Sequence, residues 1–267
     1  MEIIGYIASV LIGISLGLVG SGGSMLTVPV LVYLMHVNPL LATTSSLFIV
    51  GATSLVGGLR AYAKKIVDFK AVTEFGIPSI FSIFITRHYL LPALPQHFFS
   101  IGHISVSKEM FLMLVFALLM LAASFSMIRS RYLESQAGLT EKDRDNKALF
   151  LVVLGLFIGV VTGLLGAGGG FLIIPSLVLF LKLPMKNAVG TSLLIVAINS
   201  LLGFLFSLKQ FEYNWTILLS FTALSVAGLF IGSKLSEKIP GDSLKKGFGW
   251  FVLVMGIYII VKELLIR

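Results

Sequence analysis

The chain contains no cysteine, so disulfides, thiolate catalysis and Cys-ligated metal sites are excluded. Charged residues are also scarce, at 12% of 267 residues, whereas 57% of the residues are hydrophobic and the mean hydropathy is +1.02. A chain with so little charge cannot cover a folded domain with a water-facing surface. We therefore expect a multi-pass protein embedded in a lipid bilayer.

Basic residues outnumber acidic ones by 20 to 12, but they lie in loops between apolar runs rather than on one face. This distribution is typical of a membrane-orientation signal, so we expect no nucleic-acid partner. Met1 and Glu2 lack the basic start of a cleavable signal, and the first apolar segment is expected to stay. The four histidines are scattered without metal-ligand spacing, and we expect neither a metal nor a cofactor.

The most prominent feature that is present is an internal duplication. The glycine-rich segment Gly17–Pro29 returns as Gly163–Pro175, 146 residues later, and 17 of the 41 positions in 17–57 match their partners at this offset. Further along, Asp68 falls opposite Asn214. The sequence predicts one integral membrane domain with a first repeat at 1–128, a linker at 129–147 and a second repeat at 148–267.

Apolar stretches fall near 3–20, 25–35, 41–60, 71–91, 109–128, 148–165, 171–181, 187–208, 214–233 and 246–265. Most approach the roughly 20 residues that a spanning helix needs, but 25–35 and 171–181 have only about half that length. We expect these two to be half-helices in an all-α polytopic membrane protein. Because backbone polar groups need internal partners in lipid, the glycine breaks should lie inside the protein or beside water.

The breaks allow two topologies. If each is a re-entrant hairpin, the loops near 60–70, 129–147, 182–186 and 234–246 share one face, which then carries most of the Lys and Arg residues. By the positive-inside rule that face is cytoplasmic, both termini lie outside, and the two repeats are inverted, with three transmembrane helices each. If the breaks are kinks in eight straight spans, 129–147 and 234–246 lie on opposite faces. The charge distribution favours hairpins and a cytoplasmic linker.

A half-helix that begins at a glycine break presents free backbone N–H groups and a partial positive charge, which suits an oxyanion. Glycine also allows a ligand to approach the backbone closely. The candidate substrate-binding residues are Gly20, Ser21, Gly22, Gly23 and Ser24 in the first loop, Gly166, Ala167, Gly168, Gly169 and Gly170 in the second, and Thr44, Ser45, Thr191, Ser192 and Asn199 in the helices that follow. Close helix packing is the alternative interpretation for each of them.

The paired loops Gly17-x-x-Gly20-x-Gly22-Gly23 and Gly163-x-x-Gly166-x-Gly168-Gly169-Gly170, each followed by a proline, resemble the TauE/SafE sulfite-exporter family, also called the toluene-sulfonate uptake permeases. The similarity covers nearly the full chain. The resemblance implies a prokaryotic-type inner-membrane carrier of sulfite, sulfoacetate, taurine-derived or other sulfur-containing anions. The second loop has Ala167 and Gly170 where the first has Ser21 and Ser24, so we expect the two loops to be used unequally.

The function predicted is secondary transport of a small sulfur-containing anion (sulfite, a sulfonate such as sulfoacetate, or thiosulfate) by alternating access between inverted repeats, without enzymatic activity. A passive anion channel is one alternative. An intramembrane serine hydrolase built on Ser21 or Ser24 is another, but no histidine lies at the depth of Ser21. The sequence leaves the oligomeric state open, with a homo-oligomer among the options.

Charged side chains inside a membrane usually mark ion paths. The acidic residues all lie near segment ends or in loops, and two positions are open for Glu74: one turn inside the membrane, or at the interface in an ion pair with Lys70. No cationic side chain is expected at the midplane of the membrane, so anion binding would rest on backbone dipoles and hydroxyls. Arg87 and His88 are expected at the membrane interface, where they would snorkel or serve as an entrance charge.

Overall fold

The computed structural model describes all residues except 1, 102–103, 130–147, 167, 237–240 and 266–267. The helical elements are α1 (Glu2–Val19), the 3-10 segment η1 (Gly20–Leu26), α2 (Thr27–Pro29), the π-helical η2 (Val30–Leu34), α3 (Pro39–Ala63), α4 (Phe69–Ile85), the π-helical η3 (Thr86–Leu90), α5 (Leu91–Ala93), α6 (Lys108–Arg129), α8 (Ala148–Leu165), α9 (Gly170–Leu179), α10 (Met185–Ser207), η4 (Leu208–Gln210), α11 (Trp215–Ser236) and α12 (Gly241–Leu265). The expected linker at 129–147 lies outside the described residues except for Arg129.

Within the described residues, six helices are long and apolar enough to cross a membrane: Ile4–Leu34, Pro39–Ala63, Phe69–Ala93, Lys108–Phe125, Met185–Ser207 and Trp215–Ser236. The prediction of an all-α polytopic membrane protein is therefore confirmed. One small element was not expected. Strands β1 (His97–Ile101) and β2 (Ile104–Ser107) form an antiparallel hairpin between α5 and α6. Aromatic and β-branched residues on both sides of a glycine are a hairpin signal that an analysis of apolar runs overlooks.

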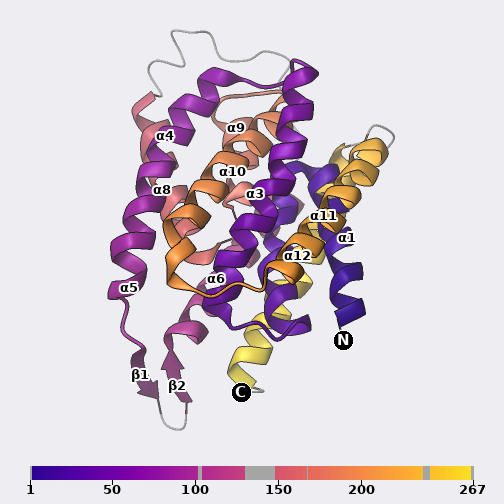
Figure 1. Ribbon diagram of the computed structural model, residues 1–267. Coiled ribbons are helices and arrows are strands. Elements are labelled where there is room, and N and C mark those ends of the chain that lie inside the picture. Colours follow the sequence, from indigo (N-terminus) through magenta and orange to yellow (C-terminus); the bar gives the residue numbers. More distant parts are fainter. Residues whose placement is uncertain (1, 102–103, 130–147, 167, 237–240, 266–267) are drawn as a thin grey trace.

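Each glycine break reverses the direction of the chain (Figure 1). In the first half, η2 returns along α1, so that a Cβ at Gly5 would lie 2.1 Å from the Met35 sulfur. A straight helix would place residues 30 positions apart about 45 Å from each other. In the second half, the rings of Phe150 and Phe180 lie 4.7 Å apart. The chain therefore folds back on itself at both breaks, as the hairpin interpretation expects and as a straight kinked span would not.

The duplication is visible in the backbone. Gly20 and Gly166 occupy equivalent positions in the two breaks and have φ angles of 71° and 68°. His36 and Lys182, which end the two returning half-helices, have φ angles of 54° and 51°. A non-glycine residue rarely adopts this left-handed conformation, so the shared pair indicates that both half-helices end in the same way.

The helix caps repeat as well. The Asp68 carboxylate accepts a hydrogen bond from the Ala71 amide at 2.9 Å at the start of α4. The Asn214 side-chain oxygen accepts one from the Ile217 amide at 3.2 Å at the start of α11. Both side chains satisfy a backbone N–H that the first helical turn leaves without a partner. The match of Asp68 with Asn214 in the sequence thus corresponds to two equivalent helix starts.

Glycines bring the two halves into backbone contact. A Cβ at Gly13 of α1 would lie 1.9 Å from the Ser225 carbonyl oxygen of α11, and one at Gly228 would lie 2.2 Å from the Val10 oxygen. Helix α8 meets α4 similarly, because a Cβ at Gly159 would lie 2.4 Å from the Ser79 oxygen. Small residues permit such close approach between membrane helices. The first helix of each half therefore packs against a helix of the other half.

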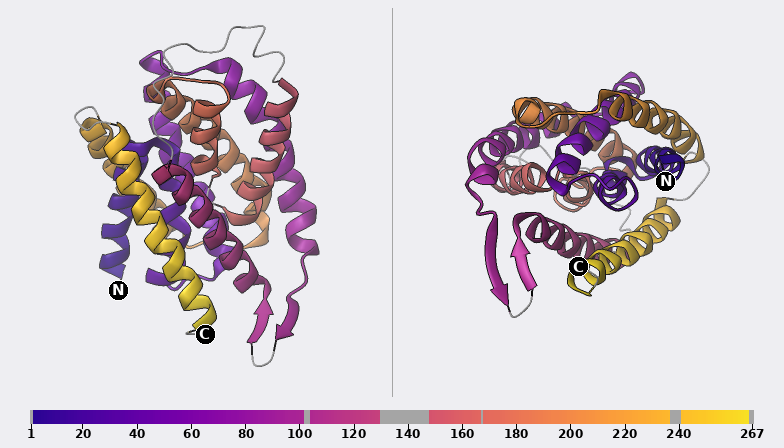
Figure 2. Two further views of the ribbon diagram at one scale, coloured as in Figure 1. Left: turned by 180° about the vertical axis from the view of Figure 1, so that it is seen from behind. Right: turned by 60° about the horizontal axis from the view of Figure 1, so that its bottom comes forward.

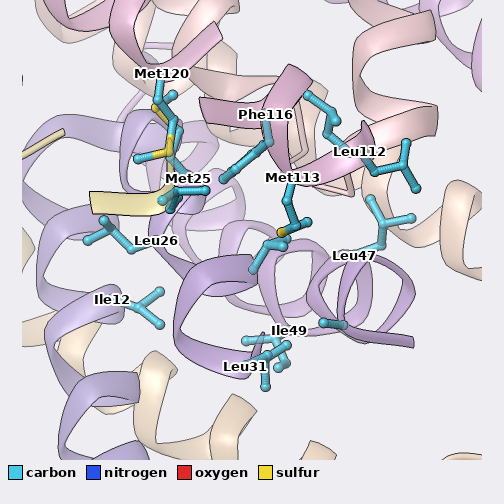
Figure 3. Close-up of a cluster of buried hydrophobic side chains, with 14 of the residues drawn as sticks. Ile12, Met25, Leu26, Leu31, Leu47, Ile49, Leu112, Met113, Phe116 and Met120 are labelled. Atoms are coloured by element: carbon cyan, nitrogen blue, oxygen red, sulfur yellow. The ribbon is translucent and has the colours of Figure 1, made fainter. Parts of the chain in front are cut away.

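Helices α6 and α12 form an outer pair beside the remaining helices (Figure 2). The inner face of α6 carries the fully buried side chains of Met113, Phe116 and Met120, and Met25 of the first break lies close to this face (Figure 3). Methionine side chains are flexible and fill irregular spaces. The first glycine break is thus covered by an adaptable apolar surface.

Both termini lie at one end of the bundle, together with the turn at 36–38 (Figure 1). The connection between α9 and α10 lies at the opposite end, as do the ends of α3 and α6. The loops after α3 and between α9 and α10, which carry Lys64, Lys65 and Lys182, thus lie at the same end, as the hairpin interpretation expects.

Candidate site at the crossing of the two glycine breaks

The first break is wound as a 3-10 helix, and all seven of its residues, Gly20–Leu26, are buried. Only Gly20 has a positive φ, and the Ser24 hydroxyl donates to the Ser21 carbonyl at 2.7 Å. The expected free helix start near Ser24 is therefore absent, because the 3-10 winding leads directly into α2 at Thr27. A Cβ at Gly23 would lie 2.5 Å from the Leu16 amide nitrogen, so Gly23 serves the packing of the hairpin.

The second break has a more open backbone. Gly166, Gly168 and Gly169 all have φ angles between 66° and 68°, and α9 begins at Gly170, as the sequence predicts. Gly169 caps α9 without a side-chain hydrogen bond, so the first amides of this helix receive no side-chain cap there. The expectation of two unequal loops agrees with these conformations. Ala167 lies outside the described residues.

Side chains from the first half contact the second break. The Ser21 hydroxyl donates a hydrogen bond to the Gly170 carbonyl oxygen at 3.1 Å, and the Ser46 hydroxyl donates to the Gly166 carbonyl oxygen. A Cβ at Gly166 would lie only 1.9 Å from the Thr43 carbonyl oxygen. The two breaks, far apart in the sequence, therefore meet inside the protein.

The hydroxyl cluster of α3 is divided between two roles. Thr43 and Ser46 face the second break, whereas the Thr44 hydroxyl donates to the Leu40 carbonyl and accepts a hydrogen bond from Arg87. Ser45 is buried in the same helix. Thr44, a predicted substrate-binding residue of this helix, is thus hydrogen-bonded to the Arg87 guanidinium rather than to a glycine loop.

The equivalent residues of α10 are less closely associated with the breaks. The Thr191 hydroxyl accepts a hydrogen bond from the Asp68 amide at 2.9 Å, near the start of α4, and Ser192 donates to the Val189 carbonyl within its own helix. Asn199 and Ser79 exchange two hydrogen bonds, at 2.7 and 3.0 Å, which tie α10 to α4. These hydrogen bonds join α10 to α4 or close within α10, rather than joining α10 to a glycine break.

Several buried hydroxyls near the second break have no hydrogen-bond partner within the described residues. They include Ser200, whose oxygen would lie 2.9 Å from a Cβ at Gly168, and Thr162, whose oxygen would lie 2.2 Å from a Cβ at Gly169. Thr86 lies beside Gly163 and is also unpartnered. Buried polar groups are normally hydrogen-bonded, so these three hydroxyls retain the capacity to donate a hydrogen bond to a further polar group.

Arg87 contradicts the expectation of a side chain that snorkels to the membrane interface. Its side chain is fully buried within the span Phe69–Ala93, and its Nη1 donates to the Thr44 hydroxyl at 2.9 Å. The apolar run was placed at 71–91, which put Arg87 close to its end, but the helical span continues to Ala93. The continuation of apolar residues after Arg87 was the signal that its position is internal.

The remaining charges follow the sequence more closely. Lys70 and Glu74 form the expected ion pair at 3.9 Å.

At the end of the bundle that holds the termini, a cavity of about 360 Å³ is lined by Tyr33, His36, Asn38, Glu109, Lys262 and Glu263, among others. The Tyr33 hydroxyl donates to the buried Glu263 carboxylate at 3.0 Å. No group of three His, Cys, Asp or Glu residues capable of holding a metal occurs among the described residues.

Ser21 is not arranged as a nucleophile in the part of the chain that is described. Its hydroxyl donates to a backbone carbonyl, and no base contacts it there. His36 and His88 are exposed, away from the buried breaks. A hydrolytic site needs a base within hydrogen-bond reach of the serine, and that geometry is not found in this region.

The sequence of this chain is similar to those of known membrane proteins. The family described as "Sulfite exporter TauE/SafE" matches residues 6–259. A "Probable membrane transporter protein" of Xylella fastidiosa is 30% identical, over 94% of this chain and 91% of that protein. The "Probable membrane transporter protein YunE" of Bacillus subtilis is 27% identical, over 96% of this chain and 95% of the relative. No solved structure matches the chain significantly.

Proposed function

The chain belongs to the TauE/SafE sulfite exporter family of membrane transporters, and on that premise we propose that it is a secondary transporter of a small sulfur-containing anion. Sulfite, a sulfonate such as sulfoacetate, and thiosulfate are the candidate substrates. The family's description supports the sulfur oxyanion. The observation that best supports the proposal is that the two glycine breaks meet, where the Ser21 hydroxyl donates a hydrogen bond to the Gly170 carbonyl oxygen.

The chemistry of this crossing suits an anion. The second break presents the start of α9, where backbone N–H groups and the helix dipole favour negative charge. Unpartnered hydroxyls of Thr86, Thr162 and Ser200 lie around the same loop and can donate hydrogen bonds. An anion held there would contact Gly168 and Gly169, while the 3-10 winding of the first break leaves Ser21 and Ser24 to support it.

We infer that transport proceeds by alternating access between inverted repeats. Three observations support this mechanism. The breaks and half-helix ends have matching backbone angles, the hairpins enter the bundle from opposite ends, and helices α1 and α8 each pack on a helix of the other half. Glycine-lined contacts let two halves tilt against each other, because no interlocking side chains need to be withdrawn. A ligand at the crossing would then face one side at a time.

The proposed location is a bacterial-type inner membrane, with the basic loops in the cytoplasm. Under this orientation Lys64, Lys65 and Lys182 lie inside, and the termini and the β-hairpin lie outside. The cavity lined by Tyr33 and Glu263 would then be on the outer side.

Flux into proteoliposomes tests the function. Purified protein should take up radiolabelled sulfite or sulfoacetate with saturation kinetics, and an unlabelled internal pool of the same anion should accelerate the uptake by counterflow. A passive anion channel would instead show flux proportional to concentration and no counterflow. Absence of flux for sulfite, sulfoacetate, thiosulfate and sulfate alike would overturn the assignment.

A further inference from the structure

Arg87 is a buried cation in an apolar span. Its side chain is 0% exposed, and it lies six residues before the end of the span at Ala93, which corresponds to a depth of about 9 Å along a helix. It belongs to η3, a π-helical turn in a helix that is otherwise α-helical over Phe69–Ile85. Such turns often occur at functional sites, because they re-aim the side chains that follow.

Only part of the guanidinium is satisfied. Nη1 donates to Thr44, whereas Nε and Nη2 have no hydrogen-bond partner, and no carboxylate pairs with the group among the residues that the structure describes. A guanidinium stays protonated in proteins and offers five N–H donors in a fixed plane. A charge buried without a partner is strongly unfavourable, so a position of this kind needs a counter-ion.

The geometry of the two unpartnered nitrogens specifies which counter-ion fits. Nε and Nη2 lie on the same edge of the guanidinium plane, where their N–H bonds are parallel and form a fork. A fork of this kind binds two oxygens of one oxyanion at once, as in arginine–carboxylate and arginine–phosphate pairs. A sulfite or sulfonate group presents oxygens with the same arrangement, but chloride does not.

The surroundings connect Arg87 to the second glycine break. Thr86, its neighbour in η3, lies against Gly163 and has an unpartnered hydroxyl. Thr44, its hydrogen-bond partner, follows Thr43, whose carbonyl oxygen lies against Gly166. The guanidinium is thus bound to α3, and the residues next to Arg87 and next to its partner Thr44 contact the segment Gly163–Gly166, which leads into the second break.

We propose that Arg87 is the cationic ligand of the transported anion, binding two of its oxygens through Nε and Nη2 while Thr44 orients the guanidinium. This proposal rests on the proposed function, since it names the residue that carries charge recognition in that site. It also predicts selectivity for anions with two or more oxygens on one centre over monatomic anions.

Titration calorimetry on the purified full chain tests the proposal with sodium sulfite, sulfoacetate and chloride as probes. Arg87→Gln should weaken sulfite or sulfoacetate binding at least tenfold. Arg87→Lys, which keeps the charge but loses the fork, should weaken it severalfold and reduce the preference for oxyanions over chloride. Arg60→Gln is a matched control, because Arg60 already donates to Ser233 and stacks on Phe230, and it should change affinity less than twofold.

The outcomes separate the two proposals. If wild type binds sulfite or sulfoacetate and a monodisperse Arg87→Gln protein binds it equally well, Arg87 is not a ligand and the proposed function stands. If Arg87→Gln does not fold, Arg87→Lys decides, and wild-type affinity together with wild-type selectivity in that variant overturns the role. If wild type binds and transports none of the probes, the proposed function fails and the role of Arg87 fails with it.

Discussion

The Ser21 hydroxyl donates a hydrogen bond to the carbonyl oxygen of Gly170, 149 residues away, and a Cβ at Gly170 would lie 2.3 Å from the Ser21 Cβ. Two hairpins that enter the bundle from opposite ends therefore meet at their turns. Both residues are buried, so this contact forms part of the interior packing between the two halves.

Gly170→Ala should reduce the stability of the folded protein, because the added methyl group overlaps the Ser21 carbonyl oxygen and side chain. Overpacking of this kind costs about 1–3 kcal/mol. The thermal unfolding midpoint in detergent measures the effect. Gly76→Ala is the control, since a Cβ at Gly76 in α4 meets nothing within 4 Å and should be neutral or slightly stabilising. Equal midpoints for the two variants would show that the crossing is not tightly packed.

Gly168→Val should abolish transport while the protein still assembles, if the second break contacts the ligand. The substitution places a branched side chain at a φ of 68° and next to the Ser200 hydroxyl. Gly22→Val makes the parallel test in the first break. Transport and the amount of folded protein are measured together. Equal loss of folded protein in both variants would support a packing role for the glycines.

Ser24→Asp should eliminate anion transport, because it places a negative charge in a fully buried break where the substrate's charge is expected. Ser24→Ala should only weaken transport, since it removes a hydroxyl that donates to the Ser21 carbonyl. A net hydrogen bond of this type contributes about 0.5–1.5 kcal/mol. Uptake at several anion concentrations measures the order of effects. Normal transport by Ser24→Asp, or better transport of an organic cation than of sulfite, would contradict the anion assignment.

Single cysteines introduced into this naturally Cys-free chain should label from two sides of the membrane. Cysteines at Lys64, Lys182 and Lys234 are expected to react from the cytoplasm, and cysteines at His36, Gln96 and Gln210 from outside. All six native residues are exposed. A membrane-impermeant maleimide applied to intact cells measures the pattern. Labelling of His36→Cys and Lys182→Cys from the same side would contradict opposed hairpins.

Alkaline pH should destabilise the protein through Tyr213, which lies in the loop before α11. Burial raises the pKa of its phenol from 10.0 to about 12, although the Arg87 charge acts in the opposite direction. The neutral form is therefore favoured in the folded state, and the stability it contributes is present below pH 10 and lost as the pH rises towards 12. Tyr213→Phe should lose less stability than the wild type between pH 10 and pH 12, because it has no phenol to ionise. The substitution also removes the hydrogen bond to the Ser207 carbonyl, which affects both pH values alike. If the stability of the wild-type protein does not change between pH 10 and pH 12, the raised pKa of Tyr213 is contradicted.

The sequence predicted the elements of this protein because their causes are local. Apolar runs of membrane length, glycine breaks followed by half-length segments, and the 146-residue offset were sufficient to locate the breaks, and the distribution of basic residues favoured hairpins over kinks. The pairing of Lys70 with Glu74 follows from their spacing on one helix. The β-hairpin before α6 was missed because hydropathy does not distinguish short strands from a polar loop.

Contacts between distant segments were decided only by the tertiary structure. Nothing local specifies that Ser21 meets Gly170, that Asn199 binds Ser79, or that the first break closes into a 3-10 helix while the second stays open. Arg87 shows the reason most clearly. A charged residue near the end of an apolar run can reach water along its own helix, and only the packing of α3, α8 and α10 around η3 encloses it beside Thr44. Local sequence thus determined which segments enter the membrane, whereas the long-range packing of the helices determined which polar groups were left inside the protein.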